Sequence, residues 1–411
     1  MRNFTAYVNW PSEHIVGLIE TALRDICTQG ALSKTAPEEH SDPGLLLQWT
    51  TYDSLVHSLT LEYPDKVLTS SYNIRKALIR KHFLHQTISS YLTKTPDCIL
   101  RKAMPQTWPI DISFADDLDD AWADELWDLS VELEKGNKWF ILKPGMDDSS
   151  DEESAGSAAD TPGNSKTTVM ISQLRHFVIQ SIVSGPNAGE GGSIGSHPFQ
   201  GFAPRSQASG ALKLFMSPNI LTLFAGAAYI SPSSQPGEDP NEMDLSAHLT
   251  NTALQDDVHE SSIRLLRELI GCDILSTPNS DEMLRLEDVR DIEDQVSNIL
   301  AETFKAALAS AVHFQVLPNA FELFGVDFLV THAPEHECES SKFQVHLLEI
   351  NAEPAIELTG ARLNWILVDL FKGIAHTCVK PFFEDTKPTS NIDQANQWLR
   401  KCLDIETRKY W

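Results

Sequence analysis

The chain has 411 residues, of which 42% are hydrophobic, so it is long and apolar enough for two or three domains or for one multi-lobed enzyme. Its net charge is −26, from 58 acidic and 32 basic residues, and this balance excludes the broadly basic surface that non-specific nucleic-acid binding needs. The sequence shows neither a leader-like start nor an apolar run of about 20 residues, so we expect a cytoplasmic protein with no membrane or direct nucleic-acid partner.

The first 105 residues predict a mixed α/β lobe at the N-terminus. Apolar residues at helical spacing predict a helix over 12–27 and a second helical stretch over 70–92. The second stretch carries the densest basic patch of the chain, namely Arg75, Lys76, Arg80, Lys81 and His82. Two interpretations stay open for this patch: a solvated helix face, or cations that contact a phosphate ligand.

Residues 106–183 predict a central lobe. An acidic amphipathic helix over 118–134 leads into an apolar strand over 138–144 that ends near Lys143, and a second strand follows at 174–180. Lys143 could reach a phosphate group as a point charge or extend into solvent at the strand end.

Two segments around the second strand predict loops. Residues 147–166 are acidic, small and polar, and residues 184–210 are rich in Gly, Ser and Pro. Neither composition offers side chains for a core, so we expect a disordered loop in each and treat 184–210 as a low-complexity linker.

The remaining residues, 211–411, predict a C-terminal lobe of strands and helices. We expect strand and helix signals over 212–224, helices over 261–270, 288–313, 363–372 and 393–403, and strands over 321–330 and 343–351.

The two late strands carry the most distinctive polar residues. Asp327 interrupts an apolar strand, where an ionised carboxylate is costly unless it is paired or binds a metal. Glu349 and Asn351 are two positions apart on the next strand, so both side chains point to one face. Hard oxygen ligands of this kind suit Mg²⁺ shared with a substrate phosphate. Alternatively, Asp327 is an ion-paired edge residue and the other two residues begin a turn.

Several motifs together resemble the tubulin-tyrosine ligase family, in the same order and over about 49–383. They are Arg75-Lys-Ala77, Trp139-Phe-Ile-Leu-Lys-Pro144, Phe177-Val-Ile-Gln180, His248-Leu-Thr-Asn251, Phe324-Gly-Val-Asp-Phe-Leu329 and Leu348-Glu-Ile-Asn-Ala-Glu-Pro354. The chain is most similar to the fungal-type branch, whose yeast representative is associated with P-bodies. The resemblance implies an α/β ATP-grasp fold with three lobes and ATP between the last two.

The resemblance also implies residue roles. Asp327, Glu349 and Asn351 would hold Mg²⁺, while Lys76 and Lys143 would contact the phosphates of ATP. Gln180 and Ile182 would lie at the adenine hinge, and Thr250 and Asn251 beside the nucleotide or substrate. The implied reaction activates the C-terminal carboxylate of tubulin or of another protein as an acyl phosphate and joins a free amino acid, such as tyrosine, to it.

Two family motifs are absent. A loop of the S-x-R-G-x-G-I type normally follows the strand that ends in Lys-Pro, but here Lys143 is followed closely by the acidic segment 147–153. A K-F-x-I-R string normally follows the hinge strand, and this chain contains none. Either exon ends are missing at both places, or the protein has lost activity.

Three functional hypotheses therefore stay open. The first is an ATP- and Mg²⁺-dependent ligase that acts on a protein C-terminus. The second is a catalytically impaired interaction module of the same family in cytoplasmic P-bodies. The third is an ATP-grasp ligase with a small-molecule substrate, which the His248-Leu-Thr-Asn251 motif disfavours.

Overall fold

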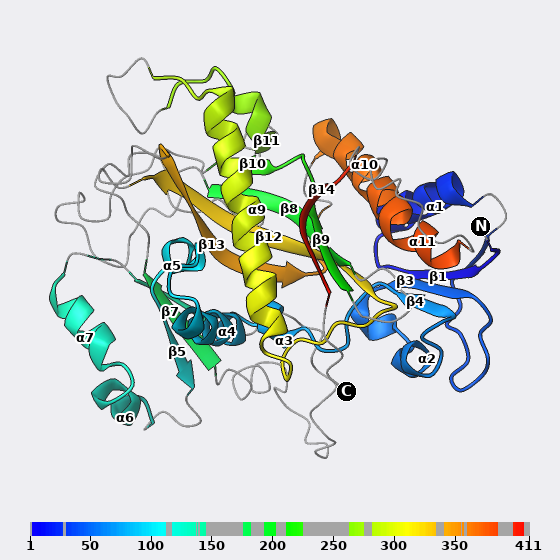
Figure 1. The fold of residues 1–411 in the computed structure, drawn as a ribbon, viewed down its shortest axis with the longest axis horizontal. Coiled ribbons are helices and arrows are strands. Elements are labelled where there is room, and N and C mark those ends of the chain that lie inside the picture. Colours follow the sequence, from blue (N-terminus) through cyan, green and yellow to red (C-terminus); the bar gives the residue numbers. More distant parts are fainter. Residues whose placement is uncertain are drawn as a thin grey trace, which may run out of the picture.

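The structure is a computed structural model, and Figure 1 shows its fold. It describes residues 2–27, 30–111, 117–136, 138, 140–144, 176–181, 193–202, 211–224, 263–274, 282–333, 341–354, 356, 360–384 and 398–406. Three sheets organise these residues, one of four strands, one of three and one of seven. No helix among them is long and apolar enough to cross a membrane.

The N-terminal sheet is parallel and has the strand order β2-β1-β3-β4. Its strands are β1 (Thr5–Asn9), β2 (Ala31–Ser33), β3 (Leu46–Thr50) and β4 (Val67–Thr69), and α2 (His57–Glu62) joins β3 to β4. The predicted first helix is α1 (Glu13–Ile26), which follows β1. Its N-cap residue Ser12 accepts a hydrogen bond from the Ile15 amide, and its apolar face is buried.

The second predicted helical stretch is divided in the structure. It contains α3 (Lys76–Ile79) and α4 (Lys81–Lys94), which are separated by Arg80 in an extended backbone conformation. A further short helix, α5 (Leu100–Ala103), precedes the central sheet. Because α4 begins at Lys81, the lysine lies at a helix N-terminus, a feature that apolar periodicity alone does not reveal.

The central sheet is antiparallel, with the order β5-β7-β6. It consists of β5 (Thr107–Asp111), β6 (Phe140–Pro144) and β7 (His176–Ser181). The acidic helix predicted over 118–134 is two helices, α6 (Asp117–Ala123) and α7 (Trp127–Glu134). They pack on this sheet through a small core that includes Leu126 and Leu129.

The C-terminal sheet has seven antiparallel strands, and five of them follow the order β11-β10-β8-β12-β13. β9 pairs with β8 and with β14. The strands are β8 (Ser193–Phe202), β9 (Ala211–Met216), β10 (Leu221–Leu223), β11 (Ile263–Leu265), β12 (Phe321–His332), β13 (Phe343–Ala352) and β14 (Arg400–Glu406). β12 and β13 are the two strands that the sequence predicts to carry the polar cluster.

Part of the predicted linker at 184–210 is a strand in the structure. β8 spans Ser193–Phe202 and pairs with β9, β10 and β12, so this part of the prediction is corrected. Its Gly- and Ser-rich composition hides the strand because distant partner strands supply the hydrogen bonds that define it. The predicted loop at 147–166 and the rest of 184–210 lie outside the described residues.

Two predicted helices are also corrected. The stretch 261–270 contains β11 and the 3₁₀ helix η7 (Leu266–Leu269), and the stretch 393–403 contains the start of β14. In both places the chain pairs with a strand far away in sequence, β10 or β9, and tertiary pairing overrides the local helical pattern.

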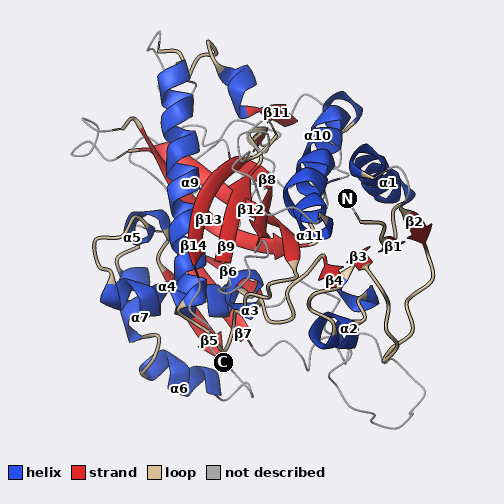
Figure 2. Ribbon diagram, turned by 45° about the vertical axis from the view of Figure 1, so that its right-hand side comes forward, coloured by secondary structure: helices blue, strands red, loops and turns tan. Residues whose placement is uncertain are grey.

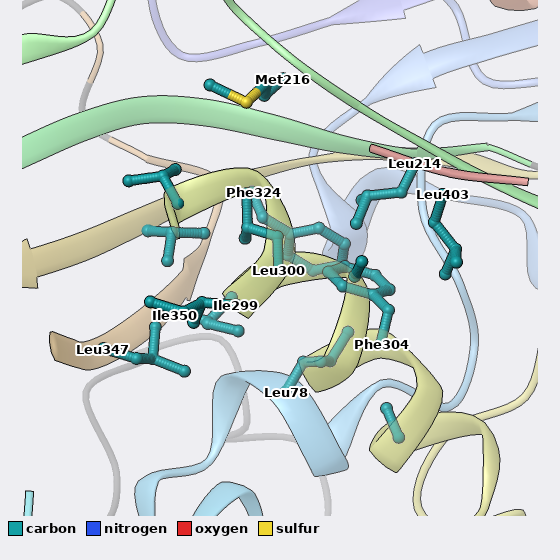
Figure 3. Close-up of a cluster of buried hydrophobic side chains, with 14 of the residues drawn as sticks. Leu78, Leu214, Met216, Ile299, Leu300, Phe304, Phe324, Leu347, Ile350 and Leu403 are labelled. Carbon is teal, nitrogen blue, oxygen red and sulfur yellow. The ribbon is translucent and has the colours of Figure 1, made fainter. Parts of the chain in front are cut away.

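The long helix predicted over 288–313 is α9 (Leu286–Leu308), which covers one face of the C-terminal sheet (Figure 1). Figure 3 shows Ile299, Leu300 and Phe304 of this helix beside Phe324 of β12 and Ile350 of β13. Each buried side chain of this size stabilises the fold by about 1.5–3 kcal/mol relative to an exposed one, so the core fixes β12 and β13 beneath the helix.

A second core joins the two ends of the chain. It lies between α1, the N-terminal sheet and the continuous helical segment α10 (Asn364–Ile374), η10 (Ala375–Val379, a π-helix) and α11 (Lys380–Phe383). Figure 2 shows α10 and α1 side by side. The polar contacts of α1 with this helical segment include His14 with Asn364 of α10 and Asp25 with His376 of η10.

Candidate active site

The candidate site lies on the antiparallel pair β12–β13. Asp327 is opposite Glu349 and Gly325 is opposite Asn351, and the register shifts between Asp327 and Phe328. This irregularity leaves Leu348 of β13 without an opposite residue on β12. Such bulges are frequent next to active sites, because they change the direction of a side chain without ending the sheet.

The three predicted metal ligands are in contact. The Asn351 Nδ2 group donates to Asp327 Oδ2 at 3.2 Å and to Glu349 Oε1 at 3.3 Å. The alternative interpretation of Asp327 as an ion-paired edge residue does not describe this structure, because β12 pairs with β8 on one side and with β13 on the other. The amide instead occupies the position between two carboxylates, where a cation would be most strongly attracted.

The chemistry of these donors fits Mg²⁺. Two carboxylates supply hard, anionic oxygens, and a turn of the Asn351 amide about its last torsion would exchange its NH₂ group for its oxygen. A small number of protein oxygens is typical of Mg²⁺ sites, which keep waters and bind substrate phosphates at the remaining positions. Asp327, Glu349 and Asn351 are therefore the residues that would hold the ion.

Two lysines from other parts of the chain face this cluster. Lys81 Nζ lies 3.4 Å from Glu349 Oε2, and its side chain is only 12% exposed. Lys143, on β6, is close enough for its charge to act on Asp327, Glu349 and Lys81. The site therefore combines carboxylates from the C-terminal lobe with a cation from each of the other two lobes.

Gln180 holds Lys143 in place. The Lys143 ammonium donates to Gln180 Oε1 at 3.1 Å, and Gln180 Nε2 donates to the Thr107 hydroxyl at 3.3 Å. All three residues lie on adjacent strands of the central sheet. Gln180 is buried, so its side chain is a fixed support for the lysine. The adenine-hinge role predicted for it stays a prediction.

The charges in the site are strongly coupled. Burial raises the pKa of Asp327 to about 7, and repulsion from Glu349 and a hydrogen bond to it act in the same direction. Burial also acts upward on Glu349, but attraction to Lys81 and Lys143 outweighs it and lowers the pKa of that carboxyl. Burial lowers the pKa of Lys143. The lowered pKa of Glu349 favours its ionised form, whereas the pKa of Asp327 lies close to neutral pH.

Gly325 positions the end of β13. A Cβ atom at this residue would lie 2.7 Å from Cβ of Pro354, which is closer than side chains approach one another. Pro354 follows Asn351 by three residues, so the close approach fixes the chain directly after a proposed ligand. This contact explains why glycine and proline accompany the acidic residues in the Phe324-Gly-Val-Asp and Glu-Ile-Asn-Ala-Glu-Pro354 motifs.

Of the remaining predicted residues, Lys76 is the one that the structure describes, and it lies outside the cluster. Lys76 lies on α3 with an exposed side chain. Ile182, Thr250 and Asn251 lie outside the described residues. Sequence reasoning did not single out Lys81 as a site residue, because it left the whole basic patch open between a solvated helix face and contact with a phosphate ligand. No local signal in the sequence separates Lys81 from its basic neighbours, because the helix break at Arg80 is seen only in the structure.

Comparison with known proteins agrees with these features. A family model described as the tubulin-tyrosine ligase family matches residues 208–387. A probable tubulin–tyrosine ligase of Schizosaccharomyces pombe is 32% identical over 427 residues, which cover 95% of each chain. The probable tubulin–tyrosine ligase PBY1 of Saccharomyces cerevisiae is 32% identical over 434 residues, covering 96% of this chain and 54% of that protein.

A solved structure is similar over almost the whole chain. It is the C-terminal domain of K. lactis Pby1, described as an ATP-grasp enzyme that interacts with the mRNA decapping enzyme Dcp2. The TM-score is 0.65 at 26% identity, over 98% of this chain and 99% of the other. The chain therefore belongs to the tubulin-tyrosine ligase family and has the ATP-grasp fold.

Proposed function

We propose that the protein is an ATP- and Mg²⁺-dependent ligase that joins a free amino acid to the C-terminal carboxylate of a protein, with tubulin as the first acceptor to test. The observation that carries the proposal is the contact of Asp327, Glu349 and Asn351 on β12–β13, faced by Lys81 and Lys143. This set of charges suits a magnesium-bound triphosphate.

The proposed reaction has two steps. The γ-phosphoryl group of ATP passes to an oxygen of the acceptor carboxylate, which gives an acyl phosphate and ADP. The amine of the amino acid then attacks the acyl carbon, so that a C–N bond forms, the C–O bond to phosphate breaks, and phosphate leaves. The ammonium group loses two protons on the way to the amide, one of which phosphate retains. Mg²⁺, when bound, would neutralise the phosphate charge.

The chain's own residues would position the reactants. Lys143 and Lys81 would bind the transferred phosphoryl group, with Lys143 supported by Gln180. Lys76, which is exposed on α3, would reach the nucleotide from the solvent side. Such catalysis depends on position and charge rather than on a protein nucleophile.

A second candidate function is an interaction module with little or no ligase activity, in the cytoplasm and associated with P-bodies. One observation favours it: the similar Pby1 domain is described as interacting with the decapping enzyme Dcp2. The missing S-x-R-G-x-G-I and K-F-x-I-R motifs also favour it, because both would contact nucleotide or substrate in the family.

The deciding experiment measures nucleotide binding and ligation separately. Calorimetry with Mg–ATP on the full chain should show binding that Glu349→Gln abolishes. An α-tubulin C-terminal peptide that lacks its last tyrosine should then gain the mass of one amino acid when ATP, Mg²⁺ and tyrosine are supplied. ATP binding without any ligation across tested amino acids and acceptors would favour the interaction module, and absence of both would overturn the ligase proposal.

A further inference from the structure

The N-terminal sheet has a feature that the proposed metal site does not use. In the order β2-β1-β3-β4, the chain continues from β1 to β2 on one side, while β3 and β4 lie on the other. The strand order therefore reverses between β1 and β3, and all pairs are parallel. In sheets of this kind, ligands bind in the crevice outside the carboxyl ends of the strands at the point of reversal.

A cavity of about 270 Å³ lies at this position. Trp10 follows β1, Thr51 follows β3, and Ser70 and Ser71 follow β4. The cavity is therefore bounded by the carboxyl ends of three strands. Ser12, the N-cap residue of α1, also lines the cavity, so the start of the helix that follows β1 forms part of the wall. Ligand pockets for drug-sized molecules span roughly 300–1,000 Å³, so a ligand of amino-acid size fits this volume better than a nucleotide does.

The far walls come from the C-terminal lobe. The start of β12 contributes Phe321 and Glu322, the residues after β13 contribute Glu353 and Pro354, and α10 contributes Phe371. The crevice is therefore closed only when both lobes are in place. Asn351 precedes Glu353 by only two residues, so the cavity rim adjoins the proposed metal site.

The polar groups of the cavity carry both signs of charge. Arg75 and Glu322 form a buried ion pair that includes the Ser71 hydroxyl, and Arg75 also lies 4.1 Å from the centre of the Tyr52 ring. Glu353 adds a carboxylate at the rim, which accepts a hydrogen bond from the Tyr52 amide at 2.5 Å. The lining therefore places a mutually paired cation and anion, Arg75 and Glu322, and the rim carboxylate of Glu353 where the two charged groups of a zwitterion can lie beside them.

One donor in the wall has no acceptor. The indole Nε1 atom of Trp10 is buried and has no hydrogen-bond partner among the residues that the structure describes. A buried donor without a partner costs about 1–3 kcal/mol, so its presence beside a cavity points to an acceptor supplied by a ligand. The apolar walls formed by Trp49, Phe321 and Phe371 would cover an apolar or aromatic body.

We propose that this crevice binds a free α-amino acid with an apolar or aromatic side chain. Its carboxylate would accept from Trp10 Nε1 and lie near Arg75, while its ammonium group would lie near Glu322 and Glu353. A phosphate ligand would meet these two carboxylates, and a purely apolar ligand would leave Trp10 Nε1 unpaired. The role of this amino acid as the one that is ligated rests on the proposed function, whereas its binding requires neither ATP nor metal.

The test is calorimetry of the full chain without ATP or Mg²⁺, using L-tyrosine, L-phenylalanine and L-leucine. At least one should bind, and analogues that lack one charged group should bind at least about tenfold more weakly, the loss of one charge-assisted hydrogen bond. For tyrosine these analogues are tyramine, which has no carboxylate, and 3-(4-hydroxyphenyl)propionate, which has no ammonium. No heat from any of the three amino acids, or equal binding of the analogues, would overturn the proposal.

Two variants locate the ligand. Trp10→Phe keeps an aromatic side chain but removes the Nε1–H donor, and it should weaken binding about tenfold. The matched control is Trp365→Phe on α10, whose side chain is 49% exposed and does not line the cavity. Should Trp10→Phe not fold, Glu353→Gln serves in its place, because it keeps an acceptor for the Tyr52 amide while removing the charge. Unchanged affinity in a folded variant of either kind would place the ligand elsewhere.

The same samples separate this proposal from the ligase function. If the chain binds an amino acid but neither binds Mg–ATP nor ligates, the proposed amino-acid site is supported and the proposed ligase function is contradicted. If ligation proceeds with the same KM for the amino acid in wild type and in Trp10→Phe, the proposed ligase function is supported and the proposed amino-acid site in the crevice is contradicted.

Discussion

Lys81 Nζ lies 3.4 Å from Glu349 Oε2, so the first residue of α4 in the N-terminal lobe contacts a proposed metal ligand on β13 of the C-terminal lobe. The lysine also acts electrostatically on Asp327 and Lys143. This contact identifies Lys81 as the cation through which the N-terminal lobe takes part in the site, and it leads to the first prediction.

Lys81→Met should weaken Mg–ATP binding by about tenfold or more, because it removes a half-buried positive charge beside the position of the phosphates. Lys76→Met is the matched control, since Lys76 is exposed five residues earlier and would lose only a screened contact. Calorimetry on both variants measures the difference. A larger effect at Lys76 would contradict our assignment and favour the role that family resemblance gives to that residue.

Asp327→Asn should stabilise the protein without ligand while abolishing Mg²⁺-dependent ATP binding. The Asp327 carboxyl lies beside Glu349 in a poorly solvated position, and its pKa is raised to about 7, so its ionisation opposes folding. A neutral amide removes that cost, and we expect a gain of about 1–3 kcal/mol at pH 8.

The pH dependence of this stability gain tests whether it comes from the Asp327 carboxyl. A carboxyl with a raised pKa in the folded state destabilises the fold as pH rises from about 4 to 7, so the gain should vanish below about pH 4. Urea unfolding at several pH values measures it. If Asp327→Asn were less stable than wild type at pH 8, the result would contradict our inference that ionisation of Asp327 opposes folding.

Gly325→Ala should destabilise the protein by about 1–3 kcal/mol, because the added methyl group would overlap Pro354. The displaced proline should also disturb Asn351 and weaken Mg–ATP binding. Gly17→Ala provides a control of opposite sign. Gly17 is exposed within α1 with open space around it, so alanine should stabilise that helix by about 0.5–1 kcal/mol. Thermal unfolding and calorimetry distinguish the two, and a neutral Gly325→Ala would show that Pro354 moves freely.

The contribution of His346 to stability should fall as pH decreases from about 6.5 to 4, opposite in sign to the contribution of Asp327 over the same range. Burial lowers the pKa of His346 to about 4, although a hydrogen bond to the Lys102 backbone acts upward. The unfolded chain therefore binds a proton in this range while the folded chain does not, and up to about 3 kcal/mol is lost as pH falls. His346→Gln should flatten this slope and can keep a hydrogen bond to Thr331. Urea unfolding between pH 7 and 4 tests it, and an unchanged slope would assign the effect to other groups.

Local patterns in the sequence were sufficient for several elements. The helical spacing in 12–27 and 288–313 predicted α1 and α9 within a few residues, because each buries one apolar face. The alternation of Glu349 and Asn351 predicted a shared face, and the structure joins both to Asp327. The family resemblance and the ATP-grasp fold were also predicted and are confirmed by the comparisons.

Other elements could not be predicted locally. β8, β11 and β14 are strands because distant strands supply their hydrogen bonds, and the local composition favoured a loop in the first and helices in the other two. The selection of Lys81 over Lys76 for contact with Glu349 depends on the start of α4 at Lys81 and on how that helix packs.

The sequence by itself determined which residue types are present for the proposed magnesium site, namely a carboxylate in an apolar strand and two polar residues at period two on the next strand. Only the tertiary structure decided which cations meet them and where the N-terminal lobe closes on the C-terminal lobe. Those contacts join residues hundreds of positions apart, such as Arg75 with Glu322 and Tyr52 with Glu353. They form because both lobes bury apolar surface together, and no local pattern contains that information.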